Sequence, residues 1–393
     1  MYASIAGEIE LPEQLPYDFD GRFKADVRLQ YYGMFKSCIS IANVCSQIGQ
    51  QLISAIDGVA LHSYTGVPFF QKNLQKYSYL NKNAPIGFFY GIPDAVPEFF
   101  FGHETTIGGF VCETNTIPAR WARILNKFDL IIVPSQFCRS AFLNSGVDTP
   151  MLVVHHGLEP EYQSHQAKQL SGRFIFYNTF NSHSFPGRKS CEELIRCFKR
   201  AFDGRSDVQL RLRAQPSPTV QDCLARYEAD SLVFIDPSGN ASTGDFAAIY
   251  SEVHCTVHPS KGEGFGLIPF QSIACETPVI APYSTGMTEY LTENNAMLLR
   301  TKGRTAGKDV YYKSGTYDLI DEDHLVELLR YATDHWETEY QKVKQVAPGF
   351  RKKYQWESVL ADMVSLIQEL LELKDSRDRR EKIRTRVTEN GVA

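Results

Sequence analysis

The residues with the most evident chemistry lie in one stretch of the second half of the chain, SKGEGFGLIPFQSIACETPVIAPYSTGMTEYL. Glu263 is followed by Gly264 and Gly266, and glycine lets main-chain N–H groups come close to a ligand. Pro269 suits the first turn of a short helix, whose N-terminus favours a phosphate because its N–H groups are unsatisfied. Gln271 adds a second polar side chain eight positions after the acid. Together these groups are suited to holding a nucleotide-linked sugar.

Two adjacent cations, Arg188 and Lys189, could serve the same ligand. When a sugar leaves a nucleoside diphosphate, negative charge grows on the diphosphate, and cations already placed in a dry cleft stabilise it by about 3 kcal/mol each. Arginine can bind two phosphate oxygens at once, and lysine supplies a compact point charge. The other interpretation is a solvated pair of charges that precedes a helix.

The stretch around Glu263 resembles the signature of the glycogen-synthase-like glycosyltransferases (glycosyltransferase family four, group 1), which are retaining enzymes of the GT-B fold. The family pattern is Glu, Gly, Phe, Gly and an apolar residue. The family has a second Glu where this chain has Gln271, and a Gly where it has Glu276. An uncharged Gln271 should bond ribose hydroxyls more weakly, and a left-handed Glu276 at the end of the helix would cost about 1 kcal/mol. In this chain the five pattern residues are Glu263, Gly264, Phe265, Gly266 and Leu267.

The resemblance implies a role for Glu263 beside the donor sugar. The equivalent acid in the family contacts sugar hydroxyls and helps to place the positive charge that develops at the anomeric carbon. The alternative is an ordinary loop acid near a helix start, where the helix dipole favours it by about 0.5 kcal/mol. The acid, the glycines and the helix occur together, which favours the functional role.

Other segments match the loops that surround the donor in this family. Ser184 lies in a loop that ends with Arg188 and Lys189, and Thr285 and Gly286 lie in a second loop. No metal ion is expected, because the GT-B pattern does not need one. The catalytic residues are therefore predicted to be Glu263, Lys189 and Arg188. The residues predicted to bind the donor are Gly33, Ser184, Arg188, Lys189, Gly264, Phe265, Gly266, Leu267, Gln271, Thr285 and Gly286.

Length and composition exclude several classes of protein. The chain has 393 residues, 43% of them hydrophobic, which is enough for two ordinary domains. Its formal net charge of −5 indicates no general attraction to nucleic acid or to anionic lipid. No apolar run approaches the roughly 18 residues that span a bilayer, and the acidic N-terminus is not expected to be a signal peptide. Nine dispersed cysteines without CxxC pairs suggest reduced thiols in the cytoplasm.

Strand patterns alternate with helix patterns along the chain, which is typical of a parallel sheet covered on both faces. Residues 130–133 are entirely apolar, as in a buried parallel strand, and Ser135 is expected to cap a helix over residues 136–144. Gly33 separates a strand from a helix over residues 37–53, where it could line the ligand cleft or form an ordinary turn. Further strands in the first half are predicted at residues 27–32, 59–62, 86–90, 109–112 and 152–155.

The second half repeats this alternation. Helices are predicted at residues 191–202, 245–251, 321–335 and 356–373, and strands at residues 174–177, 209–212, 232–235, 255–258, 279–281 and 296–299.

The predicted organisation is two Rossmann-like domains with a cleft between them. Residues 1–165 would form an acceptor domain with an arm at 1–22, and residues 166–355 a nucleotide-sugar domain. In GT-B enzymes the last helix crosses back to the first domain, and residues 356–393 are expected to do so. The tail from Lys374 is dense in both charges and is expected to be a solvated extension of that helix, although it could touch an anionic acceptor or a membrane.

The expected activity is transfer of a hexosyl or pentosyl group from a nucleoside-diphosphate sugar to a saccharide acceptor. One alternative is a nucleic-acid base as the acceptor, although specific nucleic-acid binders usually show a basic patch. Another is a non-catalytic sugar-nucleotide-binding protein, which only Gln271 suggests. His103, His155 and His156 are candidates for a donor contact in the first domain, but no motif assigns that role to any of them.

Overall fold

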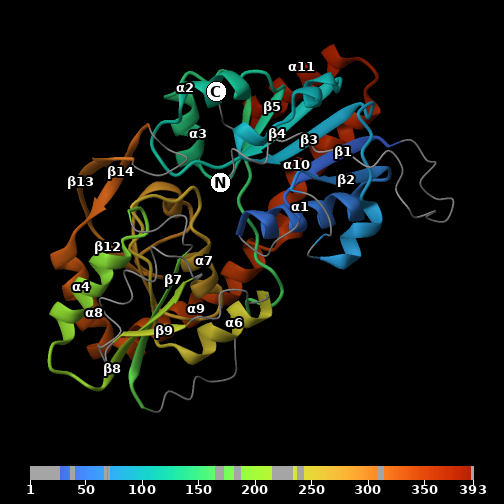
Figure 1. Cartoon of the computed structure of the whole chain (residues 1–393). Coiled ribbons are helices and arrows are strands. Elements are labelled where there is room, and N and C mark those ends of the chain that lie inside the picture. The colour runs from blue at the N-terminus through green and yellow to red at the C-terminus, as the bar shows by residue number, and fades with distance from the viewer. Residues whose placement is uncertain are drawn as a thin grey trace.

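The computed structural model describes residues 27–35, 40–65, 69, 71–163, 172–180, 187–214, 233–236, 243–307 and 314–390. These residues form two lobes, each built around a six-stranded sheet whose strands all run parallel (Figure 1). The predicted alternation of strands and helices is confirmed. The arm predicted at residues 1–22 and most of the predicted boundary between the domains lie outside the described residues.

The sheet of the first lobe has the strand order β2-β1-β3-β4-β5-β6. Its strands alternate large apolar side chains between two faces, so that Tyr31 and Phe88 face one core and Tyr32 and Phe89 face the other. The strands are β1 (Leu29–Gly33), β2 (Val59–Ser63), β3 (Ile86–Gly91), β4 (Thr105–Phe110), β5 (Leu130–Val133) and β6 (Met151–Val153). The helices of this lobe are α1 (Ser40–Ala55), α2 (Ala119–Leu125) and α3 (Gln136–Leu143), with short 3-10 turns η2 (Lys72–Tyr77), η3 (Pro93–Ala95) and η4 (Glu98–Gly102).

The sheet of the second lobe has the order β12-β11-β10-β7-β8-β9, which is the order of a doubly wound Rossmann sheet. Its strands are β7 (Phe174–Phe180), β8 (Val208–Ala214), β9 (Val233–Asp236), β10 (Cys255–Val257), β11 (Val279–Pro282) and β12 (Met297–Leu299). Its helices are α4 (Cys191–Phe202), α6 (Thr243–Glu252), α7 (Leu267–Ala274), α8 (Glu322–Asp334) and α9 (Trp336–Lys353), with the 3-10 turn η6 (Thr285–Glu289). Helices α4 and α8 share one core with the sheet, and α7 shares the other.

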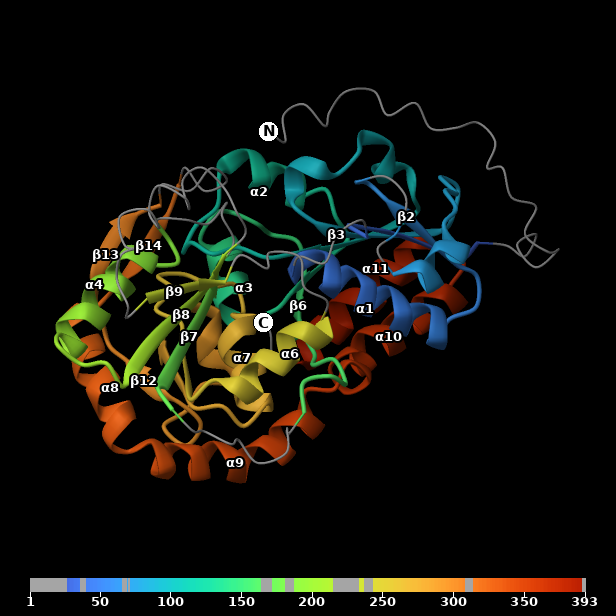
Figure 2. The ribbon, with the colours of Figure 1, turned by 60° about the horizontal axis from the view of Figure 1, so that its bottom comes forward.

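Within the described residues, the chain passes between the lobes twice, and the two passages lie side by side. Leu158 pairs with Gln355 in an isolated parallel bridge, and its N–H donates to Tyr354 O at 2.7 Å. Helix α9 runs along the second lobe, and α10 (Trp356–Glu372) then packs against α1 of the first lobe (Figure 2). α10 lies where a helix over residues 356–373 was predicted, and its buried side chains belong to the core of the first lobe.

The prediction for the charged tail was wrong. α10 ends at Glu372, and residues Ser376–Glu389 form a separate helix, α11. One side of α11 buries Ile383 and Val387 in the core of the first lobe, and Arg379 is only 4% exposed. The tail is therefore a structural part of the first lobe and not a solvated extension.

Two other elements differ from the expectation. The fourth strand begins at Thr105 and ends at Phe110, several residues before the predicted 109–112. Its glycines weaken the strand pattern, but a Cβ added at Gly109 would lie 2.1 Å from the Tyr90 ring, so the close packing needs a glycine there. A two-stranded antiparallel hairpin of β13 (Thr301–Ala306) and β14 (Thr316–Ile320) was not predicted.

Candidate active site

Glu263 lies at the centre of a buried cluster of charged groups in the second lobe. The side chains of Lys189, Arg188 and His258 all approach it. Arg188 Nη1 is 3.3 Å and His258 Nε2 is 3.0 Å from Glu263 Oε1, and Lys189 Nζ donates to the same oxygen. The structure thus brings together the acid and the two cations that the sequence singled out, and adds a histidine.

The neighbours of Glu263 keep it ionised although it is buried. Burial alone would raise the pKa of the carboxyl, but the charges of Lys189 and Arg188 and the hydrogen bond from His258 outweigh it and hold this pKa well below its usual value. Burial is the main reason that the pKa of Lys189 is lowered, and Glu263 acts in the opposite direction. Burial is also the main reason that the pKa of His258 is lowered, so this ring is neutral at pH 7. The cluster therefore holds one carboxylate, two cations and one neutral imidazole.

The order of the strands explains why these groups meet. Arg188 and Lys189 follow β7, whereas Glu263 follows β10. β7 and β10 are neighbours at the point where the strand order reverses, and in open α/β sheets ligands bind beside the carboxyl ends of such strands. The sequence places its cations and its acid on the two sides of that point.

Main-chain hydrogen bonds fix the loop that carries Glu263. Its N–H donates to Thr285 Oγ1 at 3.1 Å, and its carbonyl accepts from the N–H of Gly286 at 2.8 Å. Gly286 is needed because a Cβ there would lie 2.1 Å from Gly264 O. Arg188 Nη1 donates to Gly262 O at 2.7 Å. Thr285 and Gly286 thus hold the main chain of the acid.

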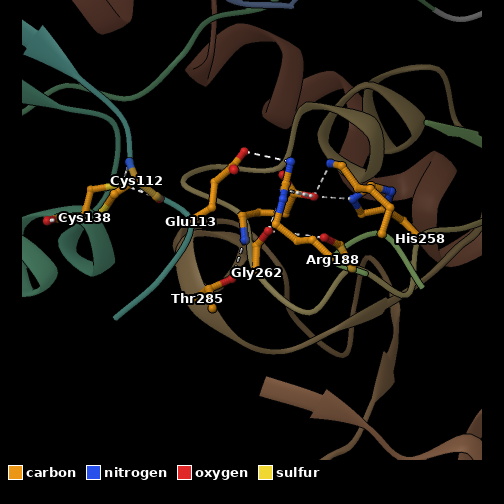
Figure 3. A network of polar contacts seen from close by, with 10 residues as sticks. Cys112, Glu113, Cys138, Arg188, His258, Gly262 and Thr285 are labelled. Atoms are coloured by element: carbon orange, nitrogen blue, oxygen red, sulfur yellow. Dashed lines mark hydrogen bonds and ion pairs between the residues drawn. The ribbon is translucent and has the colours of Figure 1, made fainter. Parts of the chain in front are cut away.

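The first lobe closes over the cluster. Glu113, which follows β4, forms an ion pair with Arg188, as Figure 3 shows, and its Oε1 lies 2.9 Å from Arg188 Nη2. Ser135 Oγ donates to Gly264 O at 2.6 Å. A Cβ on Gly264 would lie 2.1 Å from Val111 Cγ1, so the glycine allows the two lobes to touch at this position. Ser135 also caps α3 as predicted, since its Oγ accepts from the N–H of Cys138.

The hairpin of β13 and β14 touches both lobes beside the site. In the first lobe, the N–H of Thr316 donates to Asn115 Oδ1 at 2.7 Å. In the second lobe, the N–H of Asp318 donates to Lys261 O at 3.0 Å. The Tyr317 ring, 4% exposed, lies 2.9 Å from where a Cβ on Gly262 would be. The hairpin therefore connects the loop after β4 with the loop that carries Glu263.

Several predicted donor residues lie outside the charged cluster. Gln271 is buried in α7, and its Oε1 lies 3.4 Å from Tyr250 Oη. The Phe265 ring packs against the rings of Tyr290 and His156. Leu267 begins α7.

Two further predicted donor residues cannot be placed in the cluster either. Gly33 ends β1 in the first lobe, where the Phe35 ring lies 2.8 Å from the position of a Cβ. Ser184 lies outside the described residues.

The candidate histidines of the first lobe have structural partners. His103 Nε2 lies 2.8 Å from Tyr32 Oη, and its Nδ1 lies 2.6 Å from Ala84 O. His156 Nε2 lies 2.9 Å from Tyr90 Oη, and burial lowers the pKa of His156 to about 3.

The helix that carries Gln271 ends as the sequence indicated. Glu276 has a left-handed backbone with φ 56°, and its carboxylate is bound by Arg351 at 3.2 Å. The ion pair helps to offset the cost of a side chain with a left-handed backbone.

The structure adds two residues, His258 and Glu113, to the predicted site. His258 directly precedes Pro259 at the end of β10, and a position five residues before the acid was the only signal in the sequence. Glu113 is far from Arg188 along the chain, so local spacing gave no signal of their contact. Within the described ranges, no group of three or more His, Cys, Asp or Glu could hold a metal ion, and no helix is both long and apolar enough to cross a membrane.

Comparison with known proteins gives this site a context. Residues 187–363 match the family described as "Family 4 Glycosyltransferase in conflict systems". An uncharacterized glycosyltransferase of Methanocaldococcus jannaschii, MJ1178, is 21% identical over 243 residues, which are 62% of this chain and 60% of that protein. The chain thus spans less than two thirds of the length of this curated relative.

Solved structures share the fold over most of this chain. Sucrose-phosphate synthase from Thermosynechococcus elongatus superposes with a TM-score of 0.63 at 15% identity, over 88% of this chain and 99% of that one. Anabaena Alr3699/HepE in complex with UDP-glucose superposes with a TM-score of 0.64 at 12% identity, over the same shares. The predicted arrangement of two Rossmann-like sheets is therefore confirmed. The second lobe thus matches a glycosyltransferase family over residues 187–363, and the chain as a whole has the GT-B fold of these solved structures.

Proposed function

We propose that this chain transfers a sugar, with retention of configuration, from a nucleoside-diphosphate sugar to a saccharide acceptor. The observation that carries the proposal is the convergence of Glu263, Lys189 and Arg188 at the point where the strand order of the second sheet reverses. The structure of HepE with UDP-glucose supports a uridine nucleotide as the first donor to test.

The charges of the cluster suit this reaction. The bond between the anomeric carbon and the diphosphate oxygen breaks, and the diphosphate takes the electron pair. Lys189 and Arg188 would turn from the carboxylates toward that diphosphate, because its oxygens offer more negative charge. Glu263 would then face the positive charge on the sugar ring. The acceptor oxygen bonds to the anomeric carbon on the face that the leaving group occupied, and its proton passes to the diphosphate.

The first lobe is the candidate for acceptor binding. Glu113, Asn115 and the hairpin of β13 and β14 surround the charged cluster on that side. The net charge of −5 gives no support to a nucleic-acid acceptor, although a base remains an outcome that the acceptor test would reveal.

A thermal-shift panel tests the proposal. UDP, GDP and ADP, each free and as its glucose ester, would be compared at one concentration, since a ligand at 100 times its Kd stabilises by about 2.7 kcal/mol. We expect one nucleotide pair to stabilise the chain, and its sugar ester to be hydrolysed slowly. No stabilisation by any of the six would overturn the proposal. Stabilisation without hydrolysis or transfer to any saccharide would indicate a binding protein instead.

A salt titration of acceptor binding identifies the acceptor class. Binding of a neutral saccharide should change little between 50 and 200 mM salt, whereas a nucleic acid would lose affinity steeply because its phosphates release counterions.

A further inference from the structure

His258 differs from Lys189 and Arg188, which meet the same carboxylate oxygen of the candidate catalytic acid, because its side chain is neutral. It directly follows β10, its side chain is 2% exposed, and its Nε2 lies 3.0 Å from Glu263 Oε1. An ionised carboxylate only accepts hydrogen bonds, so Nε2 must carry the proton and donate it. Lys189, Arg188 and Glu263 are the charged groups that face this ring.

The contacts divide the two oxygens of Glu263. Lys189, Arg188 and His258 all meet Oε1. Within the described residues, the side-chain hydrogen bonds and the closest ion-pair contacts of Glu263 are all to Oε1 and none is to Oε2. A carboxylate held by one oxygen presents its other oxygen to whatever approaches. Oε2 is therefore the atom of Glu263 that can meet a bound sugar.

The three groups that donate hydrogen bonds or ion pairs to Oε1 should respond differently when a nucleotide sugar binds. Lys189 and Arg188 are cations with flexible side chains, and a diphosphate competes for both of them. His258 is neutral and buried beside a central strand. A diphosphate therefore attracts it much less strongly than it attracts the two cations. Its hydrogen bond to Oε1 can persist while the two ion pairs are exchanged.

We propose that His258 is a positioning residue that holds Oε1 of Glu263, so that Oε2 faces the anomeric carbon once the diphosphate has drawn Lys189 and Arg188 away. This inference rests on the proposed function. It assigns His258 an effect on turnover and little effect on nucleotide binding. A histidine that served only the packing of the loop would affect both in proportion.

Two variants separate positioning from packing. In His258→Gln the amide nitrogen can reach the place of Nε2, whereas in His258→Asn the shorter side chain cannot. Both remain polar and can be compared directly. His103→Gln is the matched control, because His103 is also buried and bonded to a neighbour but lies in the first lobe.

The readouts are kcat for the sugar nucleotide that the panel selects and the calorimetric Kd of its free nucleoside diphosphate. We expect His258→Asn to lose at least about tenfold in kcat, the value of one hydrogen bond to a charged group, with Kd unchanged within about twofold. His258→Gln and His103→Gln should keep kcat within about threefold of the unmodified chain. Thermal melting shows that each variant is folded.

The possible failures are distinguishable. An unmodified chain that neither binds nor turns over any member of the panel would overturn the proposed function itself. If that chain is active, a folded His258→Asn with unchanged kcat overturns the role of His258. So does a loss of nucleotide affinity that matches the loss of kcat, or a His258→Gln that is no better than His258→Asn. If His258→Asn does not fold, a folded His258→Leu takes its place, with the same expected loss of kcat.

Discussion

At the scale of single residues, the charge of Glu263 depends on its partners. A carboxylate that is 6% exposed would normally take up a proton, yet two cations and an imidazole N–H keep this one ionised. The arrangement also ties the acid and the cations to one another: whatever removes one of them changes the others.

Replacing Glu263 by Gln tests this coupling. We expect turnover to fall by about 10²–10³-fold, because the negative charge beside the sugar is lost. The affinity for the nucleoside diphosphate should rise, because Lys189 and Arg188 are no longer held by the carboxylate. Calorimetry and a sugar-release assay measure the two effects. Turnover at the level of the unmodified chain would remove Glu263 from the reaction.

Replacing Lys189 by Met tests the phosphate role. The Kd for the nucleoside diphosphate should rise by about tenfold or more, because a hydrogen bond from a charged group contributes about 1.5–3 kcal/mol. Lys342→Met is the control, since Lys342 pairs with Glu339 in α9, outside the charged cluster. Equal Kd values for the two variants would contradict the assignment.

The sequence allowed the prediction of Glu263, Arg188 and Lys189 because their chemistry follows from residue type and from neighbours along the chain. His258 and Glu113 could not be predicted in the same way. Their contacts depend on which strands are adjacent and on how the two lobes meet. The spacing of residues along the chain indicates neither of these arrangements. The catalytic and donor roles of all the predicted site residues, including Gln271, Gly33 and Ser184, stay predictions.

At the scale of elements, α11 shows how a charged helix can be a buried one. Arg379 Nε donates to Leu370 O and Leu373 O, both at 3.0 Å, and its Nη1 pairs with Glu104 at 2.8 Å. The guanidinium thus satisfies the end of α10 and connects it to the first sheet.

Replacing Arg379 by Ala should therefore cost about 2–3 kcal/mol of unfolding free energy, because carbonyl groups at the end of α10 lose their partner. Arg377→Ala, in the first turn of the same helix, should change it by less than about 0.5 kcal/mol because that side chain is not buried. Urea unfolding measures both. An equal effect of the two changes would mean that α11 is not bound as the structure indicates.

The elements that were not predicted share a cause. α9 contains Pro348 and Gly349 in its interior, and both residue types are unfavourable inside a helix, so the local sequence does not predict one there. The helix persists because Val343 and Ala347 are buried against the second lobe. The β13 strand exposes most of its residues and shows no apolar alternation, so only its contacts with both lobes reveal its place. Regular, half-buried elements such as α4 were predicted with their boundaries.

At the scale of the whole molecule, Glu159 lies where the chain passes between the lobes. It is buried beside α1, its Oε1 accepts from Asn43 Nδ2, and burial raises its pKa to about 7. Glu161 is a nearby charge. The ordinary pKa of 4.5 applies in the unfolded chain. The folded chain therefore binds this proton more tightly, and its stability falls as the pH rises from 4.5 toward 7.

Replacing Glu159 by Gln should remove that dependence. The unfolding free energy of the variant relative to the unmodified chain should rise by up to about 3 kcal/mol between pH 5 and pH 8. Urea unfolding at the two pH values checks this. If the difference in unfolding free energy between the variant and the unmodified chain is the same at the two pH values, Glu159 is ionised in the folded chain at both pH values.

The overall architecture was predictable because one motif resembled a known family, and the alternation of elements agreed with it. The way in which the two lobes contact each other could not be predicted, because it depends on residues that are far apart in the chain. Ser135 meets Gly264, and Arg188 meets Glu113, across more than 70 residues of sequence.

The contact at Gly264 has a consequence for the timing of catalysis. The main chain of the second lobe at Gly264 rests against Val111 of the first lobe, and a side chain there would collide with it. Under the proposed function, we expect the lobes to separate at this contact so that the spent nucleotide leaves, and to come together again for the next sugar. We then expect lobe motion as well as bond cleavage to limit turnover, and any side chain at position 264 to hinder closure.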